Sequence, residues 1–198
     1  STDLLLAVRC GELWPPQLAR QLATIDRILG EHPDHPGRSR LTVNIISSDL
    51  PGAPLDSAAR YARTLEVMQV LRRLLDGEPV AHHGEFYDLE LAPPRLRTVS
   101  GRCPPFYFGG LSEPAREVAA AAADVYLTWP DTVDATAALV ADLRRRAAAH
   151  GRTLRFGFRT HVIVRETESA ARAAAARLVS QLDDDAGARI RGRSLDTA

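Results

Sequence analysis

The chain has 198 residues, of which 45% are hydrophobic and 25% charged, so it is long enough to fold around one core and is not disordered in composition. Its 25 basic and 25 acidic residues cancel, which gives no overall electrostatic reason to expect binding to nucleic acid or to an anionic membrane. Cys10 and Cys103 lack metal-ligand spacing, no apolar run is long enough to cross a membrane, and Ser1 to Cys10 lack signal-peptide features, so we expect a cytoplasmic protein without a metal site.

Short apolar runs alternate with helical patterns in the first part of the chain. Leu4 to Val8 and Leu41 to Ser47 are continuous apolar runs, typical of parallel strands that are buried on both faces. A helix is predicted between them, over about Gln17 to Leu29. The most amphipathic helix is predicted over Ser57 to Leu75. This rhythm indicates an α/β fold with a parallel sheet.

Capping and turn residues mark the ends of this helix and the region that follows it. Asp56 or Ser57 is expected to cap the helix before it, and Gly77 is expected to end that helix. Residues 77–103 then alternate in short pieces, which predicts a hairpin rather than another strand–helix unit. His82 and His83 are adjacent on its first arm. Adjacent strand residues point to opposite faces, so this pair is poorly placed to ligate one metal ion.

The segment PPFYFGGLSEPAREVAAAAADVYLTW, from Pro104 to Trp129, predicts a strand–helix–strand unit. Pro105 to Phe108 and Val125 to Trp129 are the predicted strands. Gly109 and Gly110 allow the backbone between the first strand and the helix to turn tightly and to lie against a ligand.

Ser112 can cap the helix of this unit, and Pro114 lies in its first turn, where a missing N–H costs nothing. The free N–H groups and positive dipole end of the helix favour an anion, most often a phosphate. The alternative is a capped turn that binds no ligand. The dinucleotide fingerprint G-x-G-x-x-G is not present after the strand.

The last predicted strand, Phe156 to Val164, contains the strongest chemical pattern in the chain. Side chains alternate along a strand, so Arg159 and His161 would share one face. A buried arginine two residues from a histidine indicates a functional pair, with a structural ion pair as the alternative. Helices are predicted on either side of this strand, over Asp131 to His150 and over Ser169 to Leu182. Each is expected to bury one apolar face.

Three segments, PPFYFGG, DVYLTW and RFGFRTHVIVRE, together resemble the luciferase-like flavin monooxygenases, within them the alkanesulfonate monooxygenase branch. The resemblance extends from about Leu4 to about Asp184. It implies a (β/α)8 TIM barrel, of which this chain supplies strands similar to the third through the seventh, so that the barrel is incomplete. We expect residues 1–184 to form this barrel segment, with the hairpin inserted at about 77–103, and residues 185–198 to form a polar tail.

The resemblance also implies which residues bind the cofactor and which act in the reaction. The cofactor-binding residues would be Asn44, Tyr61, Gly109, Gly110 and Ser112. The alternatives are an Asn44 amide satisfied by nearby backbone and a Tyr61 ring that belongs to the core. The catalytic residues would be Arg159, His161 and Trp129.

In that family, reduced FMN comes from a flavin reductase, and with O2 it cleaves an alkanesulfonate to an aldehyde and sulfite. By resemblance, Arg159 would hold an oxyanion, His161 would exchange a proton, and Trp129 would form a wall of the pocket, unless it is a core residue. We also expect a homo-oligomer. The alternatives are another luciferase-like flavin or deazaflavin oxidoreductase with a different small-molecule substrate, and a truncated flavin-binding protein without catalytic activity.

Overall fold

Five parallel strands form the main sheet of the protein. The computed structural model describes residues 5–9, 42–47, 55–94, 98, 100–180, 183, 185 and 187. In chain order the elements are β1 (Leu5–Arg9), β2 (Thr42–Ile46), α2 (Ser57–Asp76), β3 (Val80–His83), β4 (Asp88–Leu91), β5 (Phe106–Phe108), α3 (Glu113–Ala122), β6 (Val125–Thr128), α4 (Val133–Ala149), β7 (Arg155–Phe158) and α5 (Glu168–Val179). The predicted helix at 17–29 and nearly all of the tail lie outside the described residues.

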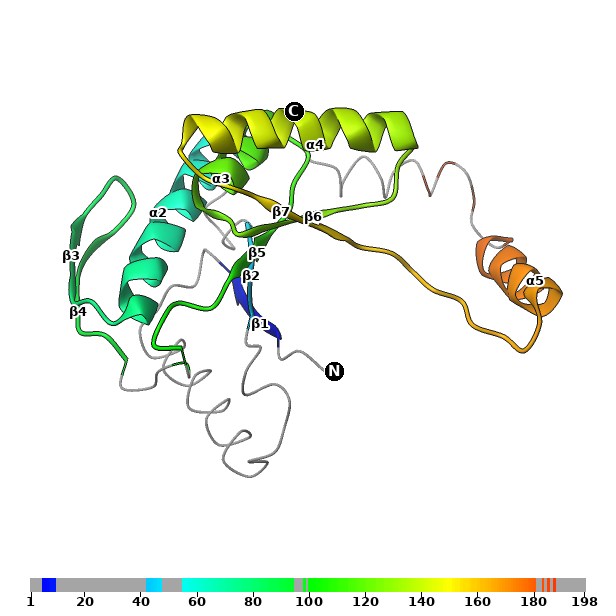
Figure 1. Ribbon diagram of the computed structural model, residues 1–198, viewed down its shortest axis with the longest axis horizontal. Helices are drawn as coiled ribbons and strands as arrows, with labels where there is room; N and C mark the ends of the chain where they lie inside the picture. Colours follow the sequence, from blue (N-terminus) through cyan, green and yellow to red (C-terminus); the bar gives the residue numbers. More distant parts are fainter. Residues whose placement is uncertain are drawn as a thin grey trace, which may run out of the picture.

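The sheet has the order β1-β2-β5-β6-β7, so strands that follow one another in it are neighbours, and every pair is parallel. Helices α2, α3 and α4 lie on one side of it (Figure 1). Neighbouring parallel strands joined by helices on one side are the repeating unit of a (β/α) barrel. The predicted α/β class and the predicted strands up to β6 are therefore confirmed, each to within one residue at either end.

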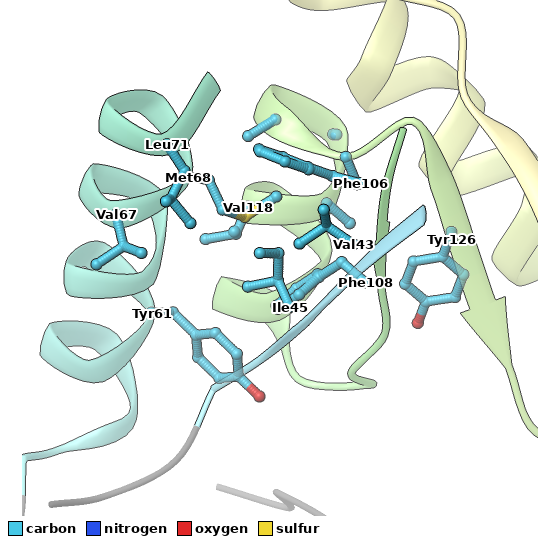
Figure 2. Packing of buried hydrophobic residues seen from close by; sticks show 14 of the residues in the cluster. Val43, Ile45, Tyr61, Val67, Met68, Leu71, Phe106, Phe108, Val118 and Tyr126 are labelled. Atoms are coloured by element: carbon cyan, nitrogen blue, oxygen red, sulfur yellow. The ribbon is translucent and has the colours of Figure 1, made fainter. Parts of the chain in front are cut away.

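The core lies between the sheet and its helices. In β2 and β5 the residues Val43, Ile45, Phe106 and Phe108 are buried, while Asn44 and Tyr107, which alternate with them, are half-buried. This alternation follows from the period of two in a strand. Figure 2 shows the buried cluster: Val43, Ile45, Phe106 and Phe108 from the strands, with Met68 and Leu71 from α2 and Val118 from α3.

Helix α2 begins and ends where the sequence predicts. The Asp56 carboxylate accepts a hydrogen bond from the N–H of Ala59 (2.7 Å), which satisfies one of the free donors at the helix start. At the other end Gly77 adopts a left-handed conformation (φ 90°), which glycine tolerates best. These two caps determine where the first turn of α2 stands relative to the carboxyl end of β2.

The predicted hairpin is present as the antiparallel pair β3–β4. The buried carboxylate of Glu66, on α2, holds it in place by accepting hydrogen bonds from the N–H of Tyr87 (2.8 Å) and from the His82 ring (2.8 Å). His82 therefore has a structural partner on the helix. A buried carboxylate with several donors around it is a strong local anchor.

The strand predicted over Phe156 to Val164 is wrong in its second half. β7 ends at Phe158, and residues 159–167 contain no regular element. The N–H of Arg159 still donates to the carbonyl of Thr128 (2.8 Å), but β6 ends at that residue and offers no partner beyond it. Alternating apolar residues need a neighbouring strand to remain in a sheet, so Arg159 and His161 are exposed and do not lie on a buried strand.

The apolar faces predicted for the last two helices are also partly wrong. In α4 only Leu143 and Ala147 are buried, and Val133 is 84% exposed. Figure 1 shows α5 at the end of the segment 159–167, away from the sheet and the other helices. Leu178, one of the apolar residues of this helix that we would expect to face inward, is 68% exposed there. An amphipathic pattern buries a face only where another element packs against it. No described helix is both long and apolar enough to cross a membrane.

Ion pairs fasten α3 to α4. Asp142 of α4 accepts a hydrogen bond from Arg116 of α3 (3.0 Å). On its own helix it also accepts hydrogen bonds from Arg145 and from Arg146 (2.9 Å). Arg146 in turn reaches Glu113, in the first turn of α3 (2.7 Å). Burial alone would raise the pKa of Asp142, but the hydrogen bond and charge of Arg146, with the charges of Arg116 and Arg145, hold that pKa below its ordinary value.

This network predicts an acid-dependent loss of stability. The folded-state pKa of Asp142 is lowered, so its contribution is present at neutral pH and is lost as the pH falls through that pKa. Asp142→Asn should lower the free energy of unfolding at pH 7 by on the order of 1 kcal/mol. Because the loss begins as the pH falls below the ordinary aspartate value of about 4, the difference between the variant and the wild type should be smaller at pH 3 than at pH 7. Urea unfolding at several pH values measures this difference, and Asp134→Asn, at an exposed position of α4, is the control. An unchanged difference at pH 3 would contradict the assignment.

Candidate functional site

A cavity of about 350 Å³ opens at the carboxyl ends of the parallel strands. Ligands bind at this end in parallel α/β folds because the loops that follow the strands converge there. Its walls come from the end of β2, the first turn of α2, the turn after β5, and the ends of β6 and β7. The lining residues are Asn44, Ile45, Ile46, Ser47, Arg60, Tyr61, Gly109, Gly110, Leu111, Tyr126, Leu127, Trp129 and Arg159.

The Gly109–Gly110 turn passes too close to its neighbours to carry side chains. A Cβ atom on Gly109 would lie 2.5 Å from the carbonyl oxygen of Leu127. One on Gly110 would lie 2.6 Å from the Cβ of Ala115 and 3.1 Å from the Tyr61 hydroxyl. The glycines therefore allow the backbone to approach other parts of the protein closely, and the turn lines the cavity. The predicted contact of this turn with a ligand stays a prediction.

Tyr61 belongs both to the core and to the cavity. Its ring is 5% exposed and stands edge-on to Phe108, with 6.2 Å between the centroids. Figure 2 shows its hydroxyl directed away from the packed side chains of the core. Arg60, the residue before it, places its guanidinium 4.9 Å from the centre of the Tyr61 ring and also lines the cavity. Both open α2, so the Asp56 cap positions them.

Ser112 differs from its expected role in one respect. It occupies the N-cap position of α3, but its side chain makes no capping hydrogen bond. The residue is 6% exposed, and within the described part of the chain its hydroxyl oxygen has no hydrogen-bond partner. A buried hydroxyl without a partner is costly, so an atom supplied by a ligand would stabilise it. The predicted side-chain cap is wrong, while the predicted ligand contact stays a prediction.

Trp129 and Arg159 line the cavity, and His161 lies against Trp129, although none of the three is inside a strand. Neither His161 nor Ser112 is among the lining residues. The guanidinium carbon of Arg159 is 4.5 Å from the centre of the Trp129 ring. The His161 ring is tilted against the same indole, with 6.1 Å between centroids. Trp129 is 44% exposed, which excludes the alternative of a core tryptophan. The Arg159 N–H bond to Thr128 sets where the chain leaves the sheet and so places the arginine beside the indole.

The charges around the cavity have one sign. Arg60 and Arg159 contribute guanidinium groups, and no residue of the described lining carries a carboxylate. Guanidinium groups stay charged at every physiological pH and present two parallel donors to an oxyanion. Helix α3 also begins at this end of the sheet, with its positive dipole end toward the turn. The arrangement suits a ligand with one or more phosphate or sulfonate groups.

Sequence reasoning did not identify Tyr126 as a site residue. This tyrosine lies within a predicted strand, and nothing in a run of apolar residues marks which side chain reaches the end of a neighbouring strand. In the structure it lines the cavity, and its hydroxyl donates to the carbonyl oxygen of Gly110 (2.6 Å). The predicted site residues Asn44, Tyr61, Gly109 and Gly110 line the same cavity.

Comparison with known proteins finds clear relatives. The sequence model of the luciferase-like monooxygenase family matches residues 3–197. A sulfoquinovose monooxygenase of Novosphingobium aromaticivorans is 61% identical over 193 residues, which cover 98% of this chain and 53% of the relative. The chain spans about half the length of the curated relatives it matches.

Solved structures of monooxygenases show the same fold. The EDTA monooxygenase EmoA from Chelativorans sp. BNC1 matches with a TM-score of 0.73 at 18% identity, over 91% of this chain and 47% of its own. The oxygenating constituent of 3,6-diketocamphane monooxygenase from Pseudomonas putida, in complex with FMN, matches with a TM-score of 0.66 at 16% identity, over 89% of this chain and 53% of its own. These matches confirm the predicted luciferase-like α/β barrel fold, of which the chain forms a part.

The close packing around Gly110 predicts that a side chain at this position destabilises the fold. Gly110→Ala should lower the free energy of unfolding by about 1 to 3 kcal/mol, because the new methyl group would overlap with Ala115 and crowd the Tyr61 hydroxyl. Gly101→Ala is the control: Gly101 has a positive φ of 69° but open space around its Cβ position. The control should lose only about 1 kcal/mol, through backbone strain. Urea unfolding compares the two, and a Gly110→Ala variant as stable as the wild type would disprove the tight packing of the turn.

Proposed function

The chain belongs to the luciferase-like monooxygenase family, and from this premise we propose that the full-length protein is a flavin-dependent monooxygenase that acts on a sulfonate. The observation that carries the proposal is the cavity at the carboxyl ends of the strands, with two guanidinium groups and no carboxylate in its described lining. Reduced FMN and a sulfonate are both anionic, so a site of this charge suits both of them.

The residues of the cavity fit FMN. The glycine turn lines the cavity with backbone alone, and the buried Ser112 hydroxyl, two residues further on, has no partner among the described residues. Backbone N–H groups at the start of α3 would complete a phosphate site at that turn. We place the phosphate there, with Tyr61 beside the flavin's tail and Asn44 beside its ring system. A deazaflavin is the alternative cofactor.

The relative with 61% identity points to sulfoquinovose, a sulfonated sugar, rather than a simple alkanesulfonate as the substrate. Both compounds carry a sulfonate on a CH2 group, so the same reaction serves either. One oxygen atom of O2 becomes the aldehyde oxygen at the former C–S carbon and the other leaves as water, while two electrons come from the reduced flavin and the sulfur departs as sulfite. The oxygen chemistry belongs to the flavin, and the protein supplies binding, orientation and charge.

Arg159, Trp129 and His161 carry the proposed protein chemistry. Arg159 would bind the sulfonate through two parallel hydrogen bonds, and Trp129 would hold the guanidinium in place by a cation–π contact. His161, whose ring lies against the same indole, would exchange a proton with the substrate as the C–S bond breaks. Trp129 therefore orients the cation and the imidazole as well as forming a wall of the pocket.

The proposed reaction requires partners. A flavin reductase would supply reduced FMN, and O2 and the sulfonate complete the set of reactants. We further propose that the protein works as a homo-oligomer in the cytoplasm. Nucleic acid and membranes are not proposed as partners, since the net charge is zero.

Sulfite release tests the proposed activity. The full-length protein, FMN, a flavin reductase with its nicotinamide cofactor, and air are incubated with sulfoquinovose or with alkanesulfonates of several lengths. We expect sulfite from sulfoquinovose at a rate at least tenfold above that from any alkanesulfonate. Sulfite only from an alkanesulfonate would identify that class as the substrate. No sulfite from any sulfonate, with FMN or with a deazaflavin, would refute the proposed function.

A charge-conserving substitution tests the role of Arg159. Arg159→Lys keeps the positive charge but loses the planar pair of donors, so kcat/KM for the sulfonate should fall by about 10- to 100-fold. Arg155→Lys is the matched control, because Arg155 is exposed on β7 and does not line the cavity. Equal activities of the two variants would remove Arg159 from the substrate site.

A further inference from the structure

A buried tyrosine joins two neighbouring strands at the floor of the cavity. The side chain of Tyr126, on β6, is fully buried, and its hydroxyl lies 2.6 Å from the carbonyl oxygen of Gly110, beyond the end of β5. Its ring packs against Phe156 of β7, with 6.4 Å between centroids. Figure 2 shows Tyr126 on β6 beside the packed side chains of β2 and β5. The ring is therefore held by packing, and the hydroxyl at its end makes the hydrogen bond to Gly110.

The Tyr126 hydroxyl is the donor in this hydrogen bond, because a carbonyl oxygen can only accept. Burial raises the pKa of Tyr126 to about 12, so the hydroxyl keeps its proton throughout the neutral range. The bond is therefore permanent at working pH and does not act as a switch.

The hydrogen bond to the Gly110 carbonyl also fixes the direction of the N–H group in the same peptide unit. The peptide unit between Gly110 and Leu111 is planar and trans, so its C=O and its N–H point in opposite directions. Because the carbonyl is held toward Tyr126, the N–H of Leu111 is turned away from that residue. Gly110 and Leu111 both line the cavity, and in the described part of the chain this N–H has no acceptor.

Two further groups pack against Gly110. A Cβ on this residue would lie 2.6 Å from the Cβ of Ala115 and 3.1 Å from the Tyr61 hydroxyl. This packing and the hydrogen bond from Tyr126 together restrict the orientation of the peptide. A preorganised donor binds an anion better than one that must first reorient, because the ordering cost has been met during folding.

We propose that Tyr126 is a positioning residue for the flavin phosphate: by holding the Gly110 carbonyl it aims the Leu111 N–H at the phosphate. The proposal rests on the proposed function, since it assumes that a flavin binds in this cavity. Tyr126 itself does not touch the phosphate in this assignment and acts only through the backbone. Its hydroxyl therefore matters for ligands that carry a phosphate and not for the ring system of the flavin.

Comparing two flavins separates this role from a merely structural one. Riboflavin has the ring and ribityl chain of FMN but no phosphate. In the full-length protein, Tyr126→Phe keeps the buried ring and removes only the donor, so it should weaken FMN binding by about tenfold. Riboflavin binding should change by less than about twofold. Fluorescence titration of each flavin measures both dissociation constants, and thermal unfolding checks the fold.

Tyr107→Phe is the matched control, since Tyr107 lies on the neighbouring strand β5 and does not line the cavity. It should leave both dissociation constants unchanged. Equal weakening of FMN and riboflavin by Tyr126→Phe, or no weakening of either, would overturn the proposal. If that variant does not fold, Tyr126→Met is the second variant without a donor. Failure of both to fold would assign the hydroxyl to stability alone and would likewise overturn it. A wild-type protein that binds neither flavin would instead refute the proposed function.

Discussion

The site depends on one backbone turn that passes too close to its neighbours to carry a side chain. At Gly109 the obstacle is the backbone of β6, and at Gly110 it is the first turn of α3 together with Tyr61 of α2. The turn therefore connects two strands and two helices within a few ångströms. Because each contact comes from a different element, the shape of the cavity requires that the sheet and its helices be assembled correctly. A substitution at the turn would therefore disturb the packing of these strands and helices.

The two ends of the parallel sheet carry different charges for different purposes. At the amino end, Asp124 accepts hydrogen bonds from the N–H of Phe106 (2.7 Å), from Arg72 (2.9 Å) and from Arg152 (3.3 Å), so that cations and carboxylate are paired. Arg72 also lies over the Phe106 ring, 4.1 Å from its centre. At the carboxyl end, Arg60 and Arg159 face a cavity whose described lining has no carboxylate. Paired charges stabilise the assembly, while guanidinium groups that line a cavity can bind an anionic ligand.

Predictions from sequence were most accurate where a local signal and the tertiary contacts agree. Asp56 and Gly77 cap the two ends of α2 as expected, because capping depends on residues a few positions apart. The second half of the last predicted strand was wrong for the opposite reason. Its alternating pattern is real, but β6 ends at Thr128, and a strand without a neighbour does not continue. The outward position of Leu178 has the same origin, since nothing among the described elements packs against that face of α5.

The sequence by itself determined the class of fold and the order of its strands and helices, because turns, caps and apolar runs depend on consecutive residues. Six of the residues that it indicated for the site, some of them only through the family resemblance, line the cavity: Asn44, Tyr61, Gly109, Gly110, Trp129 and Arg159. Only the tertiary structure decided that Arg159 stands beside Trp129 outside any strand, that Ser112 keeps its hydroxyl buried without a partner among the described residues, and that Tyr126 holds the glycine turn. Each of these facts joins residues from different elements. Distances across a sheet depend on how strands align and where they end, and neither is recorded in the spacing of residues along one chain.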